Sequence, residues 1–257
     1  MTIRPAFEIP VDDPRTAAEA ASFADRLEVC RDLEAEGLTP TPEFLAEIVN
    51  ASRSRGRRPE IAVVFQELPP PIDRRQVTPA DFAARPEDLE RLADLAPAFA
   101  EAGAGSIVLG FASPDGLPDE DAVAAAVGIA RGCGMDIAFH RAFDLAPDPA
   151  AAASRLVRLG VVRTLSAGAP GYDAGVASIE ARVERLAVAA AAVAPSDLAI
   201  VPCGGVRASN AAAFARATPH VHASCRHRPS TFELGVFDEE EAGRLRAIVH
   251  PDGPPPG

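Results

Sequence analysis

The stretch DIAFHRAFDLAPDPAAAASRLVRLGVVRTLS, residues Asp136–Ser166, contains one complete repeat of a strand, a helix and a strand. Its apolar start, Asp136–His140, predicts a strand. Asp148 predicts the helix start, because an aspartate side chain can accept the free N–H groups of a first turn, and a proline follows it. Gly160 predicts the helix end, and Val162–Ser166 predicts the next strand. This order predicts two parallel strands joined by a helical crossover.

The same alternation extends outward from this repeat to both ends of the chain. Eight short apolar runs alternate with helical patterns, and 257 residues suit a single (β/α)8 barrel. We therefore predict an α/β fold, a single-domain TIM barrel over residues 1–250, and a disordered Pro/Gly tail over residues 251–257. An open doubly wound sheet is disfavoured, because no glycine-rich fingerprint follows the first strand. The predicted strands are Phe7–Val11, Arg26–Cys30, Glu60–Phe65, Ser106–Gly110, Asp136–His140, Val162–Ser166, Leu198–Cys203 and Val221–Ser224.

The composition excludes several kinds of chemistry. All 25 basic residues are arginine, so no lysine can form a Schiff base or bind phosphate in a Walker or kinase site. A net charge of −12 argues against a nucleic-acid partner, since phosphate backbones require clustered positive charge. No apolar run is long enough to span a membrane, so we expect no membrane partner. Charge stabilisation in any site must come from arginine, backbone N–H groups or a metal.

The cysteines indicate the compartment. Cys30, Cys133, Cys203 and Cys225 form no CxxC pair, and the N-terminus lacks the apolar core of a signal peptide. We therefore expect free thiols and a cytoplasmic location.

The position of a residue along its strand selects candidates for the site. Active sites of TIM barrels lie at the C-terminal ends of the strands. Residues i and i+2 of a strand face the same side, so Glu28 and Cys30 share one face, and His222 and Ser224 share another. If these faces point inward, a carboxylate, a thiol, imidazoles and a hydroxyl meet at the mouth of the barrel.

Each of these residues also has a structural interpretation. His140 and His222 could act as general bases or metal ligands, or could close the barrel top by hydrogen bonds. Glu28 needs a partner, because a buried carboxylate is costly alone, and the pair could be functional or structural. The candidate partners are Arg26, Arg141 and Arg207.

A glycine pair follows the seventh predicted strand. Gly204 and Gly205 can present backbone N–H groups to an anion, and a helix with a free N-terminus is expected from Ser209. This arrangement favours phosphate binding, and a tight turn between strand and helix is the alternative. The loop Gln66–Pro86 contains three consecutive prolines and has the length of a lid. Asp238 with Glu241 resembles a capping box of a last helix.

Several segments together resemble the CutC family, whose members are described as copper homeostasis proteins. The similarity runs in register from Phe7 to about Cys225. It implies a (β/α)8 barrel that is cytoplasmic and homo-oligomeric. The segments are ADRLEVC (Ala24–Cys30), EGLTPTP (Glu36–Pro42), AFHRAFD (Ala138–Asp144), LVRLGVVRTLSAG (Leu156–Gly168), CGGVRASN (Cys203–Asn210) and VHAS (Val221–Ser224).

The resemblance also implies site residues at matching positions. The matching positions are Glu8, Glu28, Cys30, His140, Arg141, Asp144, Ser166, Gly168, Gly205, Asn210, His222 and Ser224. Together with the position along the strands, we predict catalytic roles for Glu28, His140 and Asp144, and a metal-binding role for Cys30. The predicted ligand-binding residues are Glu8, Arg141, Ser166, Gly168, Gly204, Gly205, Arg207, His222 and Ser224.

Two departures mark this chain as a divergent relative. Pro10 replaces a family cysteine that is proposed to bind Cu(I) together with a partner equivalent to Cys30. The family segment RPRGGDF is replaced by FQELPPPID, Phe65–Asp73, which lacks both arginines and both glycines. We therefore expect few cationic side chains at the mouth. Binding of an anionic ligand is for this reason the least secure of these expectations.

Three functions are open from the sequence. The first is a CutC-like cytoplasmic copper homeostasis protein that binds Cu(I) weakly, since soft thiolates such as that of Cys30 suit Cu(I). The second is an enzyme acting on a small anionic or phosphorylated metabolite through acid–base chemistry of His140 and Glu28. The third is a non-catalytic oligomeric barrel.

Overall fold

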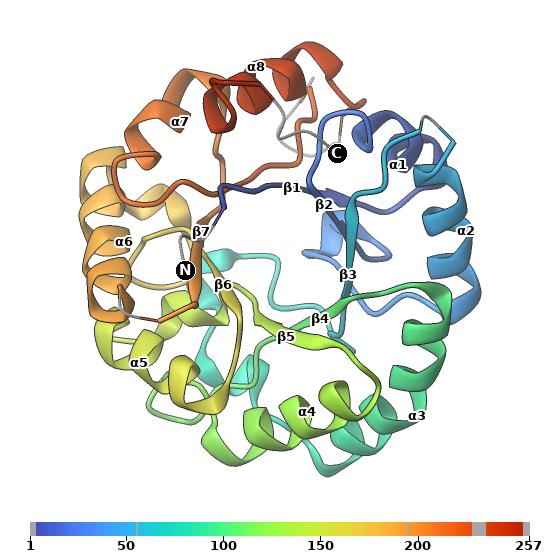
Figure 1. Ribbon diagram of the computed structural model, residues 1–257. Helices are drawn as coiled ribbons and strands as arrows, with labels where there is room; N and C mark the ends of the chain where they lie inside the picture. Colours follow the sequence, from blue (N-terminus) through green and yellow to red (C-terminus); the bar gives the residue numbers. More distant parts are fainter. Residues whose placement is uncertain (1–3, 55, 195, 228–234, 254–257) are drawn as a thin grey trace.

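The computed structural model describes residues 4–54, 56–194, 196–227 and 235–253, which form a (β/α)8 barrel. Eight parallel strands form one sheet in the order β7-β6-β5-β4-β3-β2-β1-β8, and β7 also lies next to β8, which brings the sheet round into a nearly closed barrel (Figure 1). The predicted single-domain TIM barrel is confirmed. The strands are β1 Phe7–Val11, β2 Arg26–Val29, β3 Glu60–Val64, β4 Ser106–Leu109, β5 Asp136–Phe139, β6 Arg163–Ser166, β7 Ala199–Pro202 and β8 Val221–His222.

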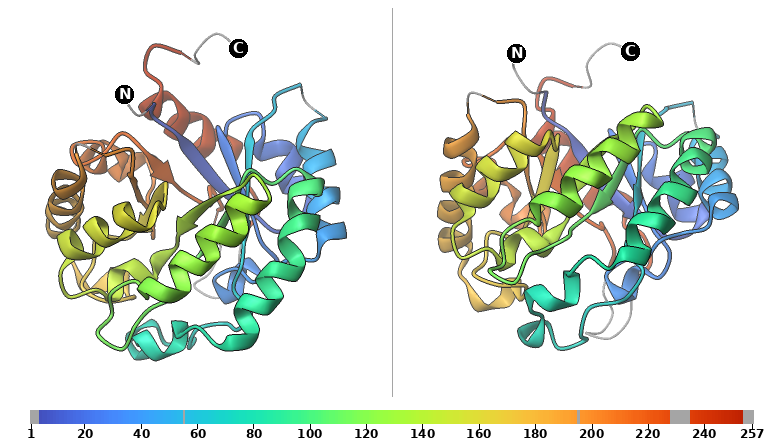
Figure 2. Two further views of the ribbon diagram at one scale, coloured as in Figure 1. Left: turned by 60° about the horizontal axis from the view of Figure 1, so that its bottom comes forward. Right: turned by 90° about the horizontal axis from the view of Figure 1, so that it is seen from below.

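The helices form a ring outside the strands (Figure 1). Both chain ends lie at the same end of the barrel, whereas the loops that follow β3 lie at the opposite end (Figure 2). We call the end where the strands begin the base and the end where they finish the mouth. The helices are α1 Pro14–Ala20, α2 Pro42–Ser52, α3 Pro86–Ala102, α4 Glu120–Gly132, α5 Pro149–Leu159, α6 Ile179–Val193, α7 Ala208–Phe214 and α8 Glu239–Val249.

Local capping explains where the helices begin and end. The side chains of Asp13, Thr41 and Asp148 accept N–H groups of the first turns of α1, α2 and α5, each ahead of a proline. Gly103 and Gly160 end α3 and α5 in the left-handed conformation, which glycine adopts without strain. These short-range interactions are the reason that the sequence pattern located the elements well.

Two layers of apolar side chains hold the barrel together. The larger layer packs the outward faces of the strands against the helices. The smaller layer fills the inside of the barrel, and its members are Cys30, Ala62, Val64, Val108, Ala138, Leu165, Val201 and Cys203. The inner layer therefore contains Cys30, which the strand alternation placed on the same face as Glu28.

Short 3-10 turns build the mouth. The loop predicted over Gln66–Pro86 contains η2, Arg74–Gln76, and η3, Pro79–Phe82, and further turns are η1, Leu33–Ala35, η4, Arg141–Leu145, and η5, Ala174–Val176. Of the predicted tail, residues 251–253 are exposed and residues 254–257 lie outside the described residues. Within the described ranges, no helix is both long and apolar enough to cross a membrane.

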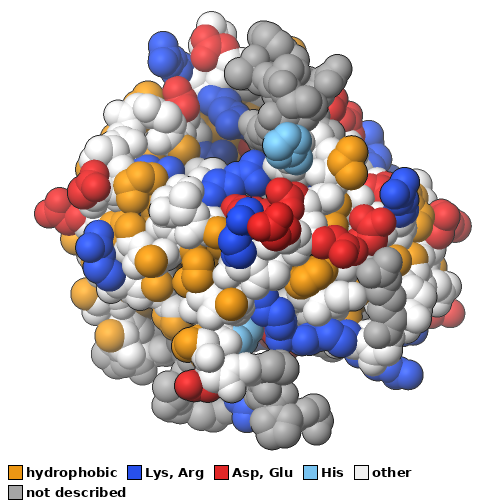
Figure 3. All heavy atoms as spheres, turned by 90° about the horizontal axis from the view of Figure 1, so that it is seen from above, with side chains coloured by type: hydrophobic (Ala, Val, Ile, Leu, Met, Phe, Trp, Pro, Cys, Tyr) orange, Lys and Arg blue, Asp and Glu red, His pale blue; other side chains and the backbone are white. Residues whose placement is uncertain are grey.

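The surface over α7 and α8 carries mixed charge (Figure 3). Arg244 pairs with Glu240 and Glu241 on α8 at 2.9 and 3.2 Å. Acidic and basic side chains alternate on this face, so it lacks the basic stripe that a phosphate backbone requires. The absence of a nucleic-acid partner stays a prediction.

Candidate active site

A cavity of about 340 Å³ opens at the mouth of the barrel. Nine predicted site residues line it, so residues from β2, β5, β7 and β8 do converge in one cleft. They are Glu28, Cys30, His140, Arg141, Gly204, Gly205, Arg207, His222 and Ser224. The other four, Glu8, Asp144, Ser166 and Gly168, are not part of this lining.

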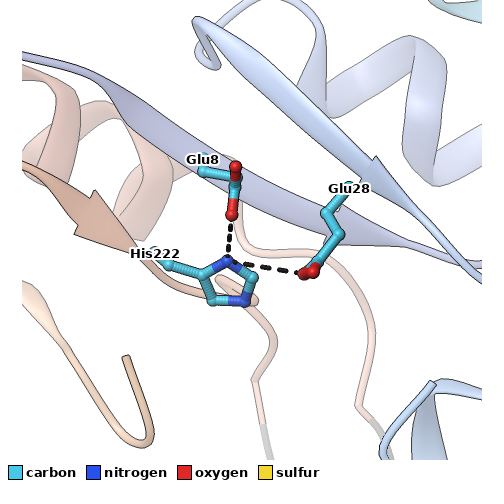
Figure 4. Close-up of side chains that lie close together, drawn as sticks. All are labelled: Glu8, Glu28 and His222. Carbon is cyan, nitrogen blue, oxygen red and sulfur yellow. Dashed lines mark hydrogen bonds and ion pairs between the residues drawn. The ribbon is translucent and has the colours of Figure 1, made fainter. Parts of the chain in front are cut away.

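Three of these side chains meet inside the barrel near β1, β2 and β8 (Figure 4). Glu8 and His222 are register partners on β1 and β8, and this pairing places the His222 Nδ1 atom 2.7 Å from Glu8 Oε1. The same Nδ1 atom lies 3.6 Å from Glu28 Oε2. One ring nitrogen thus faces two carboxylates, while Nε2 points away from both (Figure 4).

The two carboxylates have opposite electrostatic environments. Burial alone would raise the pKa of Glu8. The guanidinium groups of Arg163, 3.3 Å away, and Arg26, 3.2 Å away, together with His222, outweigh burial and hold this pKa well below its usual range. Burial raises the pKa of Glu28 to about 7. The negative charge of Glu8 adds to this rise, and His222 only partly opposes it. Glu8 is therefore a fixed anion, whereas Glu28 titrates near neutrality.

His222 has the matching shift. Burial lowers its pKa, but the charges of Glu28 and Glu8 and the hydrogen bond to Glu8 outweigh burial, so the net shift is upward. Glu28 thus titrates near neutral pH beside a histidine whose pKa is raised, which is typical of acid–base pairs in active sites. The sequence suggested Arg26, Arg141 or Arg207 as the partner of Glu28, and this was wrong: among the described residues its ion-pair partner is His222.

His140 differs from His222. Its Nδ1 accepts the Ala142 N–H at 3.0 Å, and its ring packs against Phe82 with centroids 5.0 Å apart. Burial lowers its pKa to about 3, so the ring is neutral with its proton on Nε2. Gly110, just after β4, makes room for this ring, because any Cβ there would overlap it.

The predicted pairing of His140 with Glu28 does not occur. Within the described part of the chain, no hydrogen bond or ion pair joins these two side chains, although both line the cavity. His140 can donate a hydrogen bond, but a neutral imidazole with so low a pKa is a poor proton acceptor at neutral pH.

Asp144, Ser166 and Gly168 form a buried support behind the wall. Asp144 accepts from Ser166 Oγ at 2.6 Å and from the Ala167 N–H at 2.9 Å, and the Gly168 N–H donates to Ser166 Oγ at 3.0 Å. Asp144 also lies 3.5 Å from Arg141 Nε. These contacts join the ends of β5 and β6 and position Arg141.

Phosphate binding by the N–H groups of the glycine turn after β7 stays a prediction. Gly204 and Gly205 line the cavity in left-handed conformations, and Arg182 binds the carbonyls of Cys203 and Gly204 at 2.8 Å. The expected free helix N-terminus was wrong. The Glu241 side chain reaches from α8 to α7 and accepts the Ala208 N–H at 2.8 Å. It therefore does not complete a capping box with Asp238.

Sequence reasoning missed three residues at the outer rim of the cavity: Glu36, Arg74 and Tyr172. Arg74 binds Glu36, and Tyr172 stacks on Arg141 with the guanidinium 4.3 Å from the ring centre. Arg74 comes from the loop that was expected to leave the mouth poor in cations. No sequence pattern in the loop marked Arg74 as a residue of the mouth. Glu36 begins the segment EGLTPTP, which was quoted for the family resemblance. The arginines that line the cavity at the mouth are thus Arg74, Arg141 and Arg207.

The thiols at the mouth are protonated. Cys30 and Cys203 line the cavity, and burial raises the pKa of both, to well above the usual range for Cys30. Pro10 also lines this wall, so the missing family cysteine would face the same space. Cys225 is buried elsewhere, with its thiol directed at the Ala223 carbonyl.

Glu8, Glu28 and His222 are close enough to reach one metal ion, since their ligand atoms lie within 4.8 Å of one another. However, Arg163 and Arg26 already compensate Glu8, and both carboxylates face the same imidazole nitrogen. A cation at this point would be repelled by two guanidinium groups. The arrangement therefore suits proton transfer better than a metal.

Comparisons with known proteins agree with this architecture. A solved structure of a candidate copper homeostasis protein CutC from Streptococcus agalactiae superposes with a TM-score of 0.69 at 19% identity, covering 86% of this chain and 98% of that one. The 3-dehydroquinate dehydratase of Geobacillus kaustophilus superposes with a TM-score of 0.59 at 14% identity, covering 96% and 92%. Likeness at such low identity shows the barrel fold alone.

Sequence comparison is more specific. A CutC family protein of Sinorhizobium medicae is 33% identical over 221 residues, which are 85% of this chain and 80% of the relative. One from Xanthomonas campestris is 29% identical, covering 94% and 96%. The profile of the CutC family matches residues 6–227. The chain therefore belongs to the CutC family.

Proposed function

We propose that this CutC-family protein is an enzyme that carries out general acid–base chemistry on a small anionic metabolite. The observation that carries the proposal is the contact between Glu28 and His222, 3.6 Å apart in the wall of a cavity at the barrel mouth. A carboxyl group with a pKa near 7 beside an imidazole whose pKa is raised can give and take protons at neutral pH.

The geometry divides the roles. Glu8 is a positioning residue, because it holds His222 Nδ1 and leaves Nε2 pointing away from the carboxylates. Nε2 of the protonated ring can then donate to a substrate oxygen, and the Glu28 carboxylate can accept a proton from the substrate. Glu28 lies beside Nδ1, whose proton Glu8 holds, so Glu28 releases its proton to solvent and Nε2 regains one from solvent to complete the cycle.

Other residues of the wall can orient the substrate. His140, neutral with its proton on Nε2, offers a hydrogen-bond donor. Arg141, supported by Asp144, supplies positive charge in a chain that has no lysine. Arg207 also lines the cavity, although its guanidinium donates to the Arg226 carbonyl at 2.9 Å.

Proton exchange tests this proposal. The protein would be incubated in deuterated water with a panel of small carboxylated and phosphorylated metabolites, and mass spectrometry would detect deuterium uptake or product formation. Glu28→Gln and His222→Asn are expected to lower the rate by about 10²- to 10⁴-fold. His227→Asn, on an exposed residue outside the cavity lining, serves as the control. Equal rates for Glu28→Gln and the native protein would refute the proposal.

Copper binding is the second candidate. It is favoured by the two thiols, Cys30 and Cys203, that line the same cavity. It is weakened by their raised pKa values, because the thiolate is the metal-binding form. Cu(I) titration against a chelator, repeated with Cys30→Ser, tests it. Binding that is absent, or indifferent to the substitution, removes this function.

We also propose a cytoplasmic location and a homo-oligomeric state. The free cysteines fit a reducing compartment, and the family resemblance supports both expectations. Cell fractionation and light scattering after size-exclusion chromatography measure them. A non-catalytic oligomeric barrel is the least favoured function, because the mouth carries a polar cavity with a titratable pair.

A further inference from the structure

We propose that Arg74, Arg141 and the Tyr172 hydroxyl form a subsite for a carboxylate group of the substrate, which the side chain of Glu36 occupies in the ligand-free protein. The inference deepens the proposed function and rests on it for the chemistry at the other end of the substrate. The four residues line the same cavity as Glu28 and His222.

The first observation is the convergence of donors on one carboxylate. Arg74 Nη2 contacts Glu36 Oε1, Arg141 Nη1 lies 3.6 Å from Glu36 Oε2, and Tyr172 OH lies 3.5 Å from the same oxygen. Two guanidinium groups and a hydroxyl are the donors expected around a bound carboxylate. The geometry of the rim therefore already accommodates this chemical group.

The second observation is that Glu36 satisfies these donors incompletely. Contacts of 3.5 and 3.6 Å are at or beyond the limit of a hydrogen bond. Arg141 Nε lies beside Asp144 at 3.5 Å, and the Arg141 atom that faces Glu36 is Nη1, 3.6 Å from the carboxylate. A free carboxylate, which is not tied to the backbone, could approach Arg141 more closely than Glu36 does.

The third observation is the backbone that carries Glu36. Its φ is +68°, and Asp32, at the other end of the η1 turn, has a φ of +55°. Residues with a Cβ rarely adopt this left-handed region, because it costs free energy. Contacts with the rim therefore have to hold Glu36 in place, and a competing carboxylate that takes over Arg74 and Arg141 would release it.

Arg141 itself is held rigidly for this role. Its side chain is 11% exposed, it stacks on the Tyr172 ring, and it donates to the Tyr172 carbonyl. Because the cavity measures about 340 Å³, one small molecule can reach from this subsite to Glu28 and His222. The inferred substrate is thus a small carboxylic acid with its carboxylate at the rim.

The single tyrosine provides a direct readout. The chain has one tyrosine and no tryptophan, so its intrinsic fluorescence reports on Tyr172 alone. Malonate would be titrated at constant ionic strength, with inorganic phosphate in a parallel series. Displacement of the Glu36 carboxylate from the Tyr172 hydroxyl is expected to change the emission, and calorimetry would confirm the dissociation constant.

Four variants make the test specific. Glu36→Gln removes the competing charge and is expected to tighten malonate binding about tenfold, whereas Arg74→Gln is expected to weaken it about tenfold. Arg75→Gln is the matched control, because Arg75 pairs with Asp173 and not with Glu36. Arg91→Gln, at an ion pair with Glu67 outside the cavity lining, should leave malonate affinity unchanged. Circular dichroism would verify that each variant is folded.

The outcomes separate the two proposals. Saturable malonate binding that follows this pattern supports the subsite even if no deuterium exchange is found, in which case the proposed enzyme function fails alone. The subsite is overturned if Glu36→Gln shows no saturable malonate binding or no gain in affinity. Equal weakening by Arg74→Gln and Arg75→Gln also overturns it. Tighter binding of phosphate with the same dependence on the variants refutes the assignment to a carboxylate.

Discussion

The base and the mouth of the barrel both carry buried charge, but they hold it in different ways. At the base, a cavity of about 540 Å³ is lined by Arg26, Glu60 and Arg163, among others. Arg26 pairs with Glu60 at 2.7 Å and with Glu8 at 3.2 Å. At the mouth, the smaller cavity contains Glu28 and His222, 3.6 Å apart, and the pKa values of both are raised.

The difference follows from backbone register. Glu8, Arg26 and Glu60 are successive register partners on β1, β2 and β3, so the sheet itself aligns carboxylate, guanidinium and carboxylate. Glu28 lies two residues further along β2, where its register partner is Pro10, and no guanidinium contacts it among the described residues. We call this row of Glu8, Arg26 and Glu60 the ladder. Its guanidinium group keeps Glu8 ionised, whereas Glu28 has no such neighbour in contact among the described residues and titrates near neutrality.

The largest expected effect is at the base. Glu8→Ala should lower the free energy of unfolding by about 3–5 kcal/mol, because it leaves the buried Arg163 with only Ser106 as a close polar partner. Urea unfolding followed by circular dichroism measures the loss. A change below about 1 kcal/mol would show that the ladder does not hold the base together.

An intermediate effect is expected from pH at the mouth. Glu28 and His222 both have pKa values raised in the folded state, so the folded protein holds more protons near neutrality than the unfolded chain. Stability from this pair is present below the unfolded pKa values and is lost as pH rises. The contribution of Glu28 to the free energy of unfolding should fall by about 1 kcal/mol per pH unit from about pH 4.5 to about pH 7.

The same measurement has an internal control. Burial lowers the pKa of His140 to about 3 and that of His220 to about 4, so these histidines act with the opposite sign and only below about pH 6.5. The difference in free energy of unfolding between the native protein and Glu28→Gln isolates the Glu28 contribution, because these histidines act equally in both proteins, and this difference should decline from about pH 4.5 to about pH 7. A difference that does not change with pH would contradict the raised pKa of Glu28.

The smallest expected effect is at the exposed end of the ladder. Glu60 contacts the same Arg26 as Glu8, but its side chain is 71% exposed. Glu60→Ala should cost less than about 1 kcal/mol, because solvent screens the pair. A loss comparable to that of Glu8→Ala in urea unfolding would mean that the base acts as one cooperative unit.

The sequence predicted the barrel and the faces of its strands because these depend on local patterns. Asp148, Gly160 and the apolar run before His140 define their elements through neighbours in the chain, and the structure placed them as expected. Position along a strand also identified Glu28 and His222 as residues of one mouth. Position along a strand could not show which side chains are in contact. The register between distant strands and the course of the loops depend on residues far apart in the chain, and no short sequence pattern records them.

The sequence by itself therefore determined the fold, the polar strand ends and the need for arginine in place of lysine. Only the tertiary structure decided that β8 closes against β1, which gives His222 both Glu8 and Glu28. It also decided that a distant loop returns Arg74 to the rim. Burial and a few ångströms of separation set these pKa values and pairings, and both quantities exist only once the barrel is closed.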